Sequence, residues 1–415
     1  MRSTVTFFLS VLLAVTAAAQ SLSMGNEIAS PMASDYAVST IRTDIDLVSP
    51  ANATGNITSV SYYWATAFCM NAVKIKFFRR TGGNLTLIDE RGPFTPSAVN
   101  NTIAMTPPVA VKQGDLIGIA RVANCGNASA LIGIVTAGSL SFVGDLTGTV
   151  SFDSGARRGE VIAVGATGTA TERVVAVLPV VGSTAGSYGS YFRTSLQLAN
   201  CFSYSSSPTY SGRFILRRQG VPGSWSDPSV PFEVPPNSAS TVADIVALFG
   251  YVGLGSIDVV VPEGKPLPMM ATRVFNDAGG AGTTGLSESA IDPSSVIKPG
   301  SGVPSQGATA VMMTPTDPSH TRFNIGVRTL FSGASFTAEL RNPNGTLVTK
   351  VTKTYAPNNF DQVSAESFFG GASIGANQMV VITVTDGSAI IYGSTTDNVT
   401  NDPSVQLATV AYAIF

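Results

Sequence analysis

Apolar and polar residues alternate along much of this chain with the period of two that is typical of a β-strand. In "TIRTDIDLV", the apolar side chains Ile41, Ile45 and Leu47 share one parity, and Arg42, Asp44 and Asp46 share the other. In "AVKIKFF", Val73, Ile75 and Phe77 oppose Lys74 and Lys76 in the same way. Such a pattern predicts strands with one buried face and one solvated face.

Turn-forming residues separate the alternating segments. "RRTGGNLTL" predicts a hairpin that turns at Gly82 and Gly83, and "VAVKQGDLIGIA" predicts a second one that turns at Gln113-Gly114-Asp115. The 41 glycines and 24 prolines leave few uninterrupted helical windows. We therefore expect an all-β protein of three β-sandwich modules, of the jelly-roll or immunoglobulin-like kind.

Two segments carry the same pattern of faces. They are "FRTSLQL" at 192–198 and "TRFNIGV" at 321–327, with Arg193 and Arg322 both on the polar parity. A second pair follows, "VPPNSASTVADIVALFG" at 234–250 and "YAPNNFDQVSAESFFG" at 355–370. This self-similarity predicts that the last two modules are an internal repeat.

The predicted organisation has five parts. Residues 1–19 are a signal peptide, 20–140 an N-terminal β-sandwich, 141–172 a connecting segment, 173–316 the first repeat unit and 317–415 the second. Residues 278–306 are rich in Gly, Ser and Pro, and we expect them to form a surface loop of the first unit.

The first residues have the features of a secretory signal. Arg2 precedes an apolar run over residues 5–19 that ends in three alanines, and no later segment is long and apolar enough to cross a membrane as a helix. We expect the mature chain to be secreted, or to lie at the cell surface or in the periplasm, with no transmembrane segment after signal cleavage.

The repeated part of the chain resembles known proteins. Its "FRT" strand, "VPP" turn, "LFG" stretch and "TRVFND" strand, within residues 173–415, resemble secreted bacterial tandem β-sandwich proteins of uncharacterised function. More distantly, "EVPPNSAS", "ATRVFND" and "LATVAYA" are similar to the small soluble β-sandwich transducer of sensory rhodopsins. The resemblance implies a binding or partner-docking module without catalytic machinery.

Charge and histidine content exclude several functions. With 24 Lys and Arg against 26 Asp and Glu the net charge is -2, so the strongly basic face that nucleic acid requires is not expected. His320 is the only histidine, and the chain has no "CxxC" or "HExxH" motif, which removes the usual zinc sites. A carbohydrate-active enzyme would need only a carboxylate pair, for which Asp244, Glu339 and Glu366 are candidates.

Three cysteines raise the question of a disulfide. Cys69 and Cys125 end apparent strands of the first module, and in an oxidising compartment we expect them to be bonded to each other. Two buried free thiols are the alternative. Cys201, at the end of a repeated strand, is expected to be a buried thiol.

Two basic segments and two tryptophans are candidate binding residues. "KIKFFRR" at 74–80 and "RFILRR" at 213–218 suit a groove for an anionic polysaccharide, but protection of strand faces and edges is the favoured interpretation. Trp64 and Trp225 either stack on sugar rings or belong to the core.

The repeated arginines are candidates for a ligand or interface site. We expect Arg193 and Arg322 to be structural first, each paired with a carboxylate such as Asp244 or Glu366. If the two repeat units pack with these faces together, the same arginines become an interface.

The segment "TTDNVTND" is the candidate metal site. Asp397, Asn398, Asn401 and Asp402 supply oxygen donors that suit calcium, whereas the alternative is an ordinary turn, which prefers the same residues. No other cofactor is expected.

These observations predict a secreted, non-enzymatic binding protein whose partner is an extracellular polysaccharide or a surface protein. A structural or adhesive spacer protein is the first alternative. A carbohydrate-active enzyme with a carboxylate pair is the second.

Overall fold

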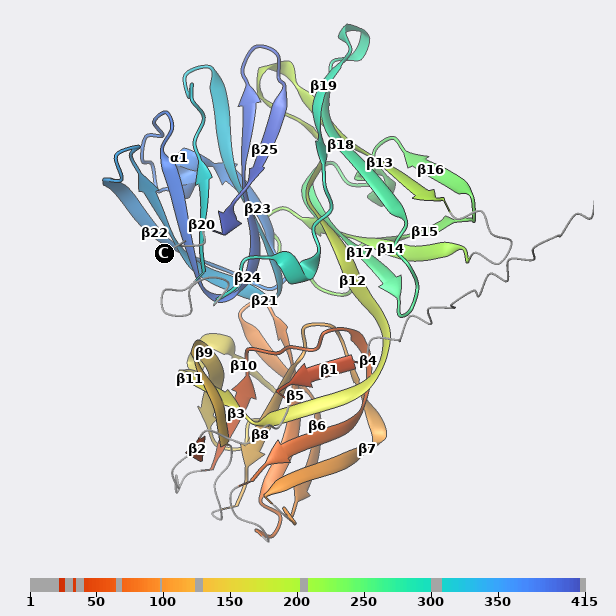
Figure 1. The fold of residues 1–415 in the computed structure, drawn as a ribbon, viewed down its shortest axis with the longest axis vertical. Coiled ribbons are helices and arrows are strands. Elements are labelled where there is room, and N and C mark those ends of the chain that lie inside the picture. The colour runs from red at the N-terminus through yellow and green to blue at the C-terminus, as the bar shows by residue number, and fades with distance from the viewer. Residues whose placement is uncertain are drawn as a thin grey trace, which may run out of the picture.

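The computed structural model describes residues 22–26, 33–34, 41–64, 69–97, 99–123, 130–201, 208–299 and 308–410. It has 64% strand and ~5% helix, and its strands form three antiparallel sheets (Figure 1). The prediction of an all-β chain is confirmed. The predicted signal peptide lies outside the described residues.

The N-terminal region, which comprises the described residues up to Glu172, contains two sets of strands. The first set is β2 (Ala33–Ser34), β3 (Arg42–Asp46), β5 (Val73–Thr81), β6 (Asn84–Phe94), β8 (Leu116–Arg121), β9 (Ala130–Val143), β10 (Thr149–Ser151) and β11 (Ala156–Ile162). They form one sheet in the order β10-β6-β5-β8-β3-β9-β11, with β2 on β9. The second set is β1 (Leu22–Gly25), β4 (Thr54–Tyr63), β7 (Asn100–Val111) and the first part of β12 (Val164–Ala185).

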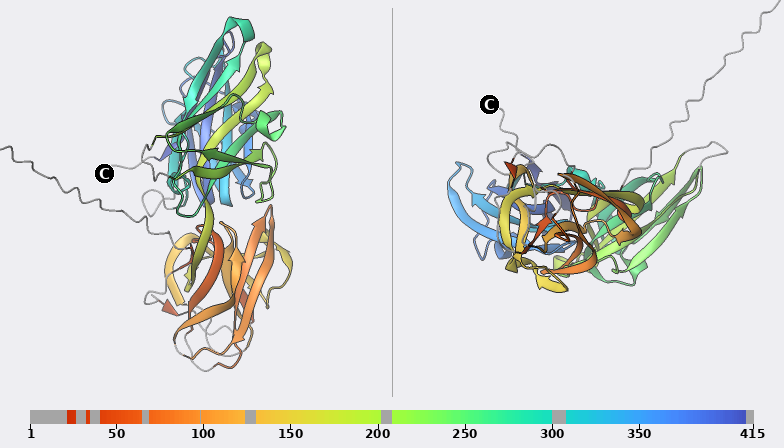
Figure 2. Two further views of the ribbon diagram at one scale, coloured as in Figure 1. Left: turned by 90° about the vertical axis from the view of Figure 1, so that its right-hand side faces the viewer. Right: turned by 90° about the horizontal axis from the view of Figure 1, so that it is seen from below.

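The long strand β12 joins the N-terminal region to the next one. Its first part pairs with β1 and β4, and its second part pairs with β13 (Tyr191–Asn200) and β17 (Gly253–Pro262). Figure 2 shows this strand passing from the N-terminal region into the rest of the molecule. Residues 141–172, expected to be a connecting segment, therefore lie largely in strands, namely the end of β9, β10, β11 and the start of β12.

The middle region, residues 173–299, is built around the second part of β12. Its other strands are β13, β14 (Tyr210–Arg218), β15 (Ser229–Val234), β16 (Ser238–Val242), β17, β18 (Met269–Asp277) and β19 (Thr283–Glu288). β14 pairs with β15 and β17, and β17 pairs with β12. β13 pairs with β16 and β18, and β18 pairs with β19.

The C-terminal region, residues 308–410, forms a seven-stranded sheet. It contains β20 (Ala308–Met313), β21 (Thr321–Arg341), β22 (Leu347–Tyr355), β23 (Phe360–Ser364), the short helix α1 (Ala365–Phe368), β24 (Met379–Asp397), β25 (Pro403–Leu407) and β26 (Thr409–Val410). The second half of β21 pairs with β22 and with the first half of β24, which also pairs with β20. The first half of β21 pairs with β23 and with the second half of β24, which also pairs with β25.

Left-handed residues occur at turns of both the middle and the C-terminal regions. Asn237, before β16, has φ 52°, and Asn358, before β23, has φ 51°. Further along, Gly250 and Gly264 have φ 62° and 71°, and Gly370 and Gly387 have φ 69° and 68°. Because Asn and Gly tolerate this conformation best, the turns explain the Pro-Asn and Phe-Gly matches of the sequence.

The two repeated segments have the faces that their pattern predicted. In β13, Thr194, Leu196 and Leu198 are buried and Gln197 is exposed; in β21, Phe323, Ile325 and Val327 are buried and Arg322 and Asn324 are half-buried. Gly326 is the exception on the polar parity, because the ring of Tyr392 lies where its Cβ would be.

Period-two alternation predicted a solvated face for β3 and β5, and this was wrong. Asp44, Asp46 and Lys76 have relative exposures of 2%, 1% and 0%. Apolar clusters lie on both sides of their sheet, one of them around Ile75 and the other around Phe78. The polar side chains of these strands are therefore enclosed, and each meets a partner, such as Asn26 for Asp46 and Asp145 for Lys76.

One of the two predicted hairpins is confirmed. Thr81 pairs with Asn84 across the turn at Gly82 and Gly83. The turn at 113–115 does not form a hairpin, because β7 pairs with β4 whereas β8 pairs with β3 and β5. The chain there crosses from one sheet to the other.

The predicted surface loop at 278–306 is more structured than its composition indicated. It contains β19, and beyond β19 an isolated bridge joins Ile291 to Val177 and another joins Ile297 to Ala389. Residues 289–299 therefore run between the middle and C-terminal regions. Residues 300–307 lie outside the described residues.

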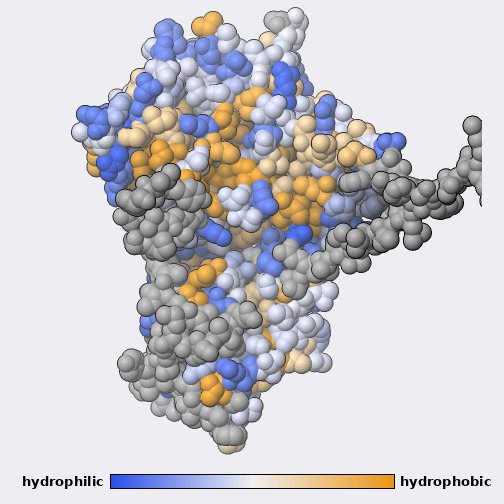
Figure 3. Space-filling view, viewed as in Figure 1, coloured by the Kyte–Doolittle hydropathy of each residue, from blue (hydrophilic) through white to orange (hydrophobic). Residues whose placement is uncertain are grey.

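A buried seam joins the middle and C-terminal regions. Its apolar part includes Val177 and Val260 from the middle region and Leu330 and Ile390 from the C-terminal region. Apolar residues also gather at the surface along this seam (Figure 3).

The seam also contains a group of charges, the seam cluster, formed by Arg217, Asp227, Asp258 and Arg328. Asp258 accepts hydrogen bonds from Arg328 and, at 2.8 Å, from Arg217, and Arg217 also contacts Asp227 at 2.8 Å. Arg217, Asp258 and Arg328 are all 0% exposed. The seam cluster therefore ties β14 and β17 to β21 of the C-terminal region inside a buried interface.

Candidate functional site

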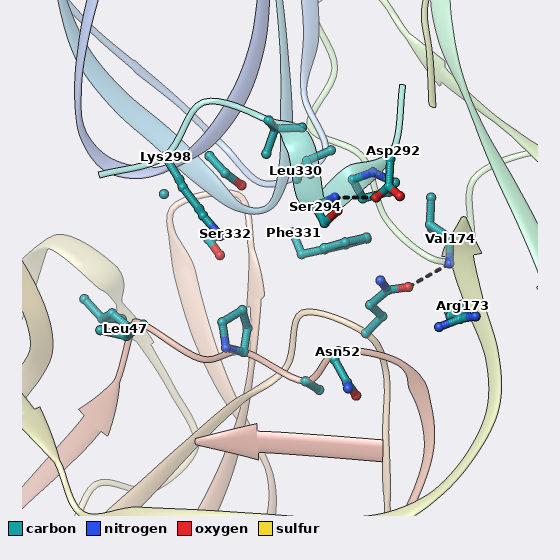
Figure 4. A pocket seen from close by; sticks show the side chains of 18 of the residues that line it. Leu47, Asn52, Arg173, Val174, Asp292, Ser294, Lys298, Leu330, Phe331 and Ser332 are labelled. Atoms are coloured by element: carbon teal, nitrogen blue, oxygen red, sulfur yellow. Dashed lines mark hydrogen bonds between the residues drawn. The ribbon is translucent and has the colours of Figure 1, made fainter. Parts of the chain in front are cut away.

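The three regions meet around one cavity of about 680 Å³, which we call the junction cavity (Figure 4). Its walls come from residues 47–52 and Gln113 of the N-terminal region, 173–175 and 292–299 of the middle region, and 330–332 and 386–388 of the C-terminal region. A concave space between domains is a common place for a binding site.

The turn at Gln113 and Gly114 holds the N-terminal wall in place. The Gln113 side chain accepts a hydrogen bond from the backbone N–H of Val174 at 2.8 Å, and its backbone carbonyl accepts one from Trp225 Nε1 at 3.2 Å. Gly114 has φ 91°, and a Cβ at this position would lie 2.3 Å from the Cβ of Phe331. The N-terminal region thus contacts both other regions through one turn.

An aromatic pair stands beside the cavity. Phe331 lines it, and the ring of Trp225 stacks on Phe331 with a centroid distance of 6.5 Å and an interplanar angle of 2°. Lys112 and Arg213 lie over the Trp225 ring at 5.9 and 5.8 Å. These contacts fix the orientation of Phe331, whose side chain lies at the centre of the view in Figure 4.

The charged side chains of the wall are balanced. Arg173 and Lys298 are cationic, and Asp292 and Asp386 are anionic. Arg173 lies 3.8 Å from Glu263, Asp386 lies 2.7 Å from Arg157, and Asp292 accepts a hydrogen bond from the Ser294 N–H at 2.7 Å. The cavity therefore offers polar groups of both signs around an aromatic surface, an arrangement that suits recognition of a polar ligand.

Arg80 closes one edge of the junction. Its guanidinium lies 3.6 Å from the centre of the Phe152 ring and donates to the backbone carbonyl of Ser332. Burial lowers the pKa of Arg80 to about 10. A charge of this kind, placed in a cation–π contact and an inter-region hydrogen bond, holds the regions together.

We expect Gly114→Ala to lower the free energy of unfolding by about 1–3 kcal/mol, since it combines backbone strain with a clash against Phe331. Gly144→Ala is the matched control, because Gly144 has φ 94° but open space around its Cβ position. Urea unfolding of both variants separates the two causes. An equal loss in both would show that strain alone matters and that the Phe331 contact is not limiting.

Arg193 lies away from the junction cavity. It contacts Asp277 at 3.0 Å and Asp244 at 3.9 Å, so the expected partner Asp244 is present. Asp244 itself accepts hydrogen bonds from the Ser183 hydroxyl and from the N–H groups of Val246 and Ala247. The arrangement fixes the loop between β16 and β17 and leaves the Arg193 side chain 42% exposed.

Arg322 has amide oxygens as partners where a carboxylate such as Glu366 was expected. Its guanidinium donates to Asn398 Oδ1 at 3.1 Å and to Asn401 Oδ1 at 2.9 Å, and it lies 5.2 Å from the centre of the Tyr188 ring. Asn401 also donates to the backbone carbonyl of Tyr188 at 3.1 Å. Arg322 therefore lies at the contact between the C-terminal region and the β12–β13 turn.

The candidate calcium residues form a turn in which Asp397 Oδ1 and the amide oxygens of Asn398 and Asn401 already accept hydrogen bonds. Asp397 Oδ1 accepts hydrogen bonds from Val399 N and Thr400 N, and these bonds lower the pKa of Asp397. The backbone carbonyl of Asp402 accepts from Asp397 N at 3.1 Å. A calcium ion here would have to displace Arg322 from Asn398 and Asn401. The described residues contain no group of three or more His, Cys, Asp or Glu placed to hold a metal ion.

The two tryptophans have different environments. Trp64 is 0% exposed in the core of the N-terminal region, so its ring offers no face to a ligand. Trp225 is half-buried and supports the junction cavity through Phe331.

The cysteines also have different environments. Cys69 is buried and disulfide-bonded, whereas Cys201 is a free cysteine. The predicted partner of Cys69, Cys125, lies outside the described residues, so the pairing stays a prediction. Cys201 is exposed, so the expectation of a buried thiol was wrong.

Most basic residues of both segments are paired within the protein, whereas Arg218 is exposed and lies over the Tyr251 ring. Lys74 and Lys76 each contact Asp145 at 2.7 Å, and Arg79 binds both oxygens of Asp115. In the second segment, Arg213 contacts Glu172 at 2.8 Å. Neither segment presents a row of arginines or lysines to an anionic chain, which agrees with the structural interpretation.

The candidate catalytic carboxylates come from different elements. Asp244 follows β16, Glu339 lies in β21 and Glu366 in α1, and none of them lines the junction cavity. His320 is exposed and hydrogen-bonded to Asp317 at 2.6 Å. Residues 371–375, "GASIG", have the spacing of a nucleophile elbow that the sequence reasoning missed, but they lie in the loop between α1 and β24 and not on a strand-to-helix turn.

Among the described residues no helix is both long and apolar enough to span a membrane. No protein-family model matches the chain, and a search of curated proteins found no match either.

Proposed function

We propose that the protein is a secreted, non-enzymatic extracellular binding protein that takes its ligand, a polysaccharide or a segment of a surface protein, in the junction cavity. The observation that carries this proposal is the cavity itself, which all three regions build together. It is preformed because Gln113, Trp225 and Arg80 link its walls. A preformed site lowers the entropy cost of binding.

The scaffold of this function is three β-sandwich modules, of which the last two are copies of one unit. The pairing scheme supports the repeat, because β13, β14, β17 and β18 pair as the two halves of β21 and β24 do. The left-handed pairs Asn237 and Asn358, Gly250 and Gly370, and Gly264 and Gly387 support it further.

A substitution that fills the junction cavity tests the proposal. In a glycan array and a pull-down with insoluble polysaccharides, each with calcium and again with EDTA, residues 20–415 should be retained selectively. Ser388→Trp, which places a ring in the cavity, should weaken retention about tenfold or more, whereas Ser404→Trp on exposed β25 should not. Retention that survives the Ser388 substitution would place the ligand elsewhere. Loss of retention in EDTA would favour the turn at Asp397 as a calcium-dependent ligand site.

A structural or adhesive spacer is the second candidate function. The seam cluster favours it, because a buried interface of this kind locks the middle and C-terminal regions into one body. If wild type and both variants were all retained no better than on an empty matrix, the spacer function would be favoured over the binding function.

A further inference from the structure

The N-terminal region carries a second concave surface, separate from the junction cavity, which we call the sheet groove. It has a volume of about 620 Å³ and lies across β7, β4, β12 and β1. Its lining residues are Ser23, Met24, Gly25, Asn26, Ser59, Ser61, Asn100, Asn101, Thr102, Gly165, Ala166 and Thr167.

The groove lies on the outer face of these four strands. Along β4, Val60 and Tyr62 are buried in the core, while Ser59 and Ser61 are half-exposed on the opposite parity. On β12, Thr167 is exposed next to the buried Ala166 in the same way. Strand alternation therefore directs hydroxyl groups into the groove.

The chemistry of the lining is neutral and rich in hydrogen-bonding groups. Among the residues that the structure describes, none that lines the groove is acidic, basic or histidine. The hydroxyls of Ser61 and Thr102 form a hydrogen bond of 2.8 Å in which either oxygen can be the donor. Hydroxyl and amide groups donate and accept at the same site, as sugar hydroxyls require, whereas an anionic or cationic chain would find no counter-charge here.

An aromatic side chain stands at one end of the groove. Tyr63 follows Ser59 and Ser61 on the same parity of β4, and it pairs in register with the lining residue Asn100. Tyr63 is half-buried, and its parity directs its side chain to the same face as Ser59 and Ser61. An apolar ring beside polar groups is a combination that binds the two kinds of surface of a sugar ring.

The β1 side of the groove is held rigidly. The Asn26 side chain donates to Asp46 at 2.7 Å and to the Ile162 carbonyl at 3.1 Å. A Cβ on Gly165 would lie 2.4 Å from the Asn26 carbonyl, so glycine at this position lets the chain lie directly over β12. The groove is therefore preformed, which reduces the entropy cost of binding.

We infer that the sheet groove binds a neutral polysaccharide, with hydroxyl and amide groups along its length and Tyr63 against one sugar ring. The inference goes beyond the proposed function, because it names a second site on a different surface and a ligand class without charge.

The test compares retention of residues 20–415 on insoluble β-1,4-glucan, β-1,3-glucan and chitin, with alginate as the anionic matrix. We expect retention on at least one neutral matrix. Ser61→Arg, which adds bulk and charge to the groove, and Tyr63→Ala should each weaken it about tenfold or more. Ser240→Arg on exposed β16 is the matched control and should bind like wild type.

Circular dichroism shows whether each variant is folded. If Ser61→Arg does not fold, Tyr63→Ala still tests the groove. Failure to bind any neutral matrix, or binding that Ser61→Arg and Tyr63→Ala leave unchanged, would overturn the inference. Loss of binding in Ser388→Trp alone would also overturn it while supporting the proposed function, so the two proposals fail separately.

Discussion

Replacing Asp258 with Ala is expected to lower the free energy of unfolding by about 3–5 kcal/mol, because it leaves the charges of Arg217 and Arg328 buried without their partner. Burial acts to raise the pKa of Asp258, but the charges of Arg328 and Arg217 outweigh it and the pKa lies below its ordinary value. The carboxylate is therefore ionised in the folded protein at neutral pH. Urea unfolding at pH 7 measures the effect.

The control is an exposed ion pair of the same kind. Arg157→Ala breaks the contact with Asp386, where the arginine side chain is 37% exposed, and should cost only about 0–1 kcal/mol. A triple variant, Arg217→Met with Asp258→Leu and Arg328→Met, should recover much of the loss, because apolar side chains of similar volume can replace a buried ion pair. If Asp258→Ala were no more harmful than Arg157→Ala, solvent would have to reach the seam.

The fold class could be predicted from the sequence because strand alternation is local. The faces of 192–198 and 321–327 followed from parity alone, since a buried position every second residue is fixed by the strand itself. The same rule was wrong for β3 and β5, where a second layer of apolar residues covers the face that was expected to be wet. Parity distinguishes two faces but does not say what covers each of them.

The candidate site was harder to predict because its residues are distant in sequence. The junction cavity depends on contacts such as Trp225 with Gln113 and Arg80 with Ser332, for which no spacing gives a signal. Arg217 was recognised only as part of a basic segment, and its partners Asp258 and Arg328 lie on other strands. Gln113-Gly114 was identified as a turn, but its role in joining regions depends on how the sheets stack.

Glu288 is expected to make the protein less stable as the pH rises. Its carboxyl group accepts a hydrogen bond from Val180 N at 3.0 Å, and burial raises its pKa from 4.5 to about 8. The neighbouring Tyr392, whose pKa is itself raised by burial and then by Glu288, gives the carboxylate no compensating positive charge. The folded protein therefore holds a neutral Glu288 at pH values where the unfolded chain is already ionised.

This difference in the pKa of Glu288 between the folded and unfolded states sets the direction of the pH dependence of stability. The stability that Glu288 contributes is fully present below pH 4.5 and is lost as the pH rises to about 8, with a total change of about 5 kcal/mol. Asp46, whose pKa burial raises to about 6, acts in the same direction, so only a comparison with a variant isolates Glu288.

Glu288→Gln cannot ionise, so its free energy of unfolding relative to wild type should increase between pH 5 and pH 8, as measured by urea unfolding at several pH values. Asp46→Asn is the companion variant: it should remove only the share of the pH dependence that Asp46 contributes up to about pH 6, and leave the share of Glu288, which continues to about pH 8. A difference between Glu288→Gln and wild type that stays constant over this range would mean that Glu288 is ionised in the folded protein. A positive charge or water would then have to reach the buried carboxyl group beside Tyr392.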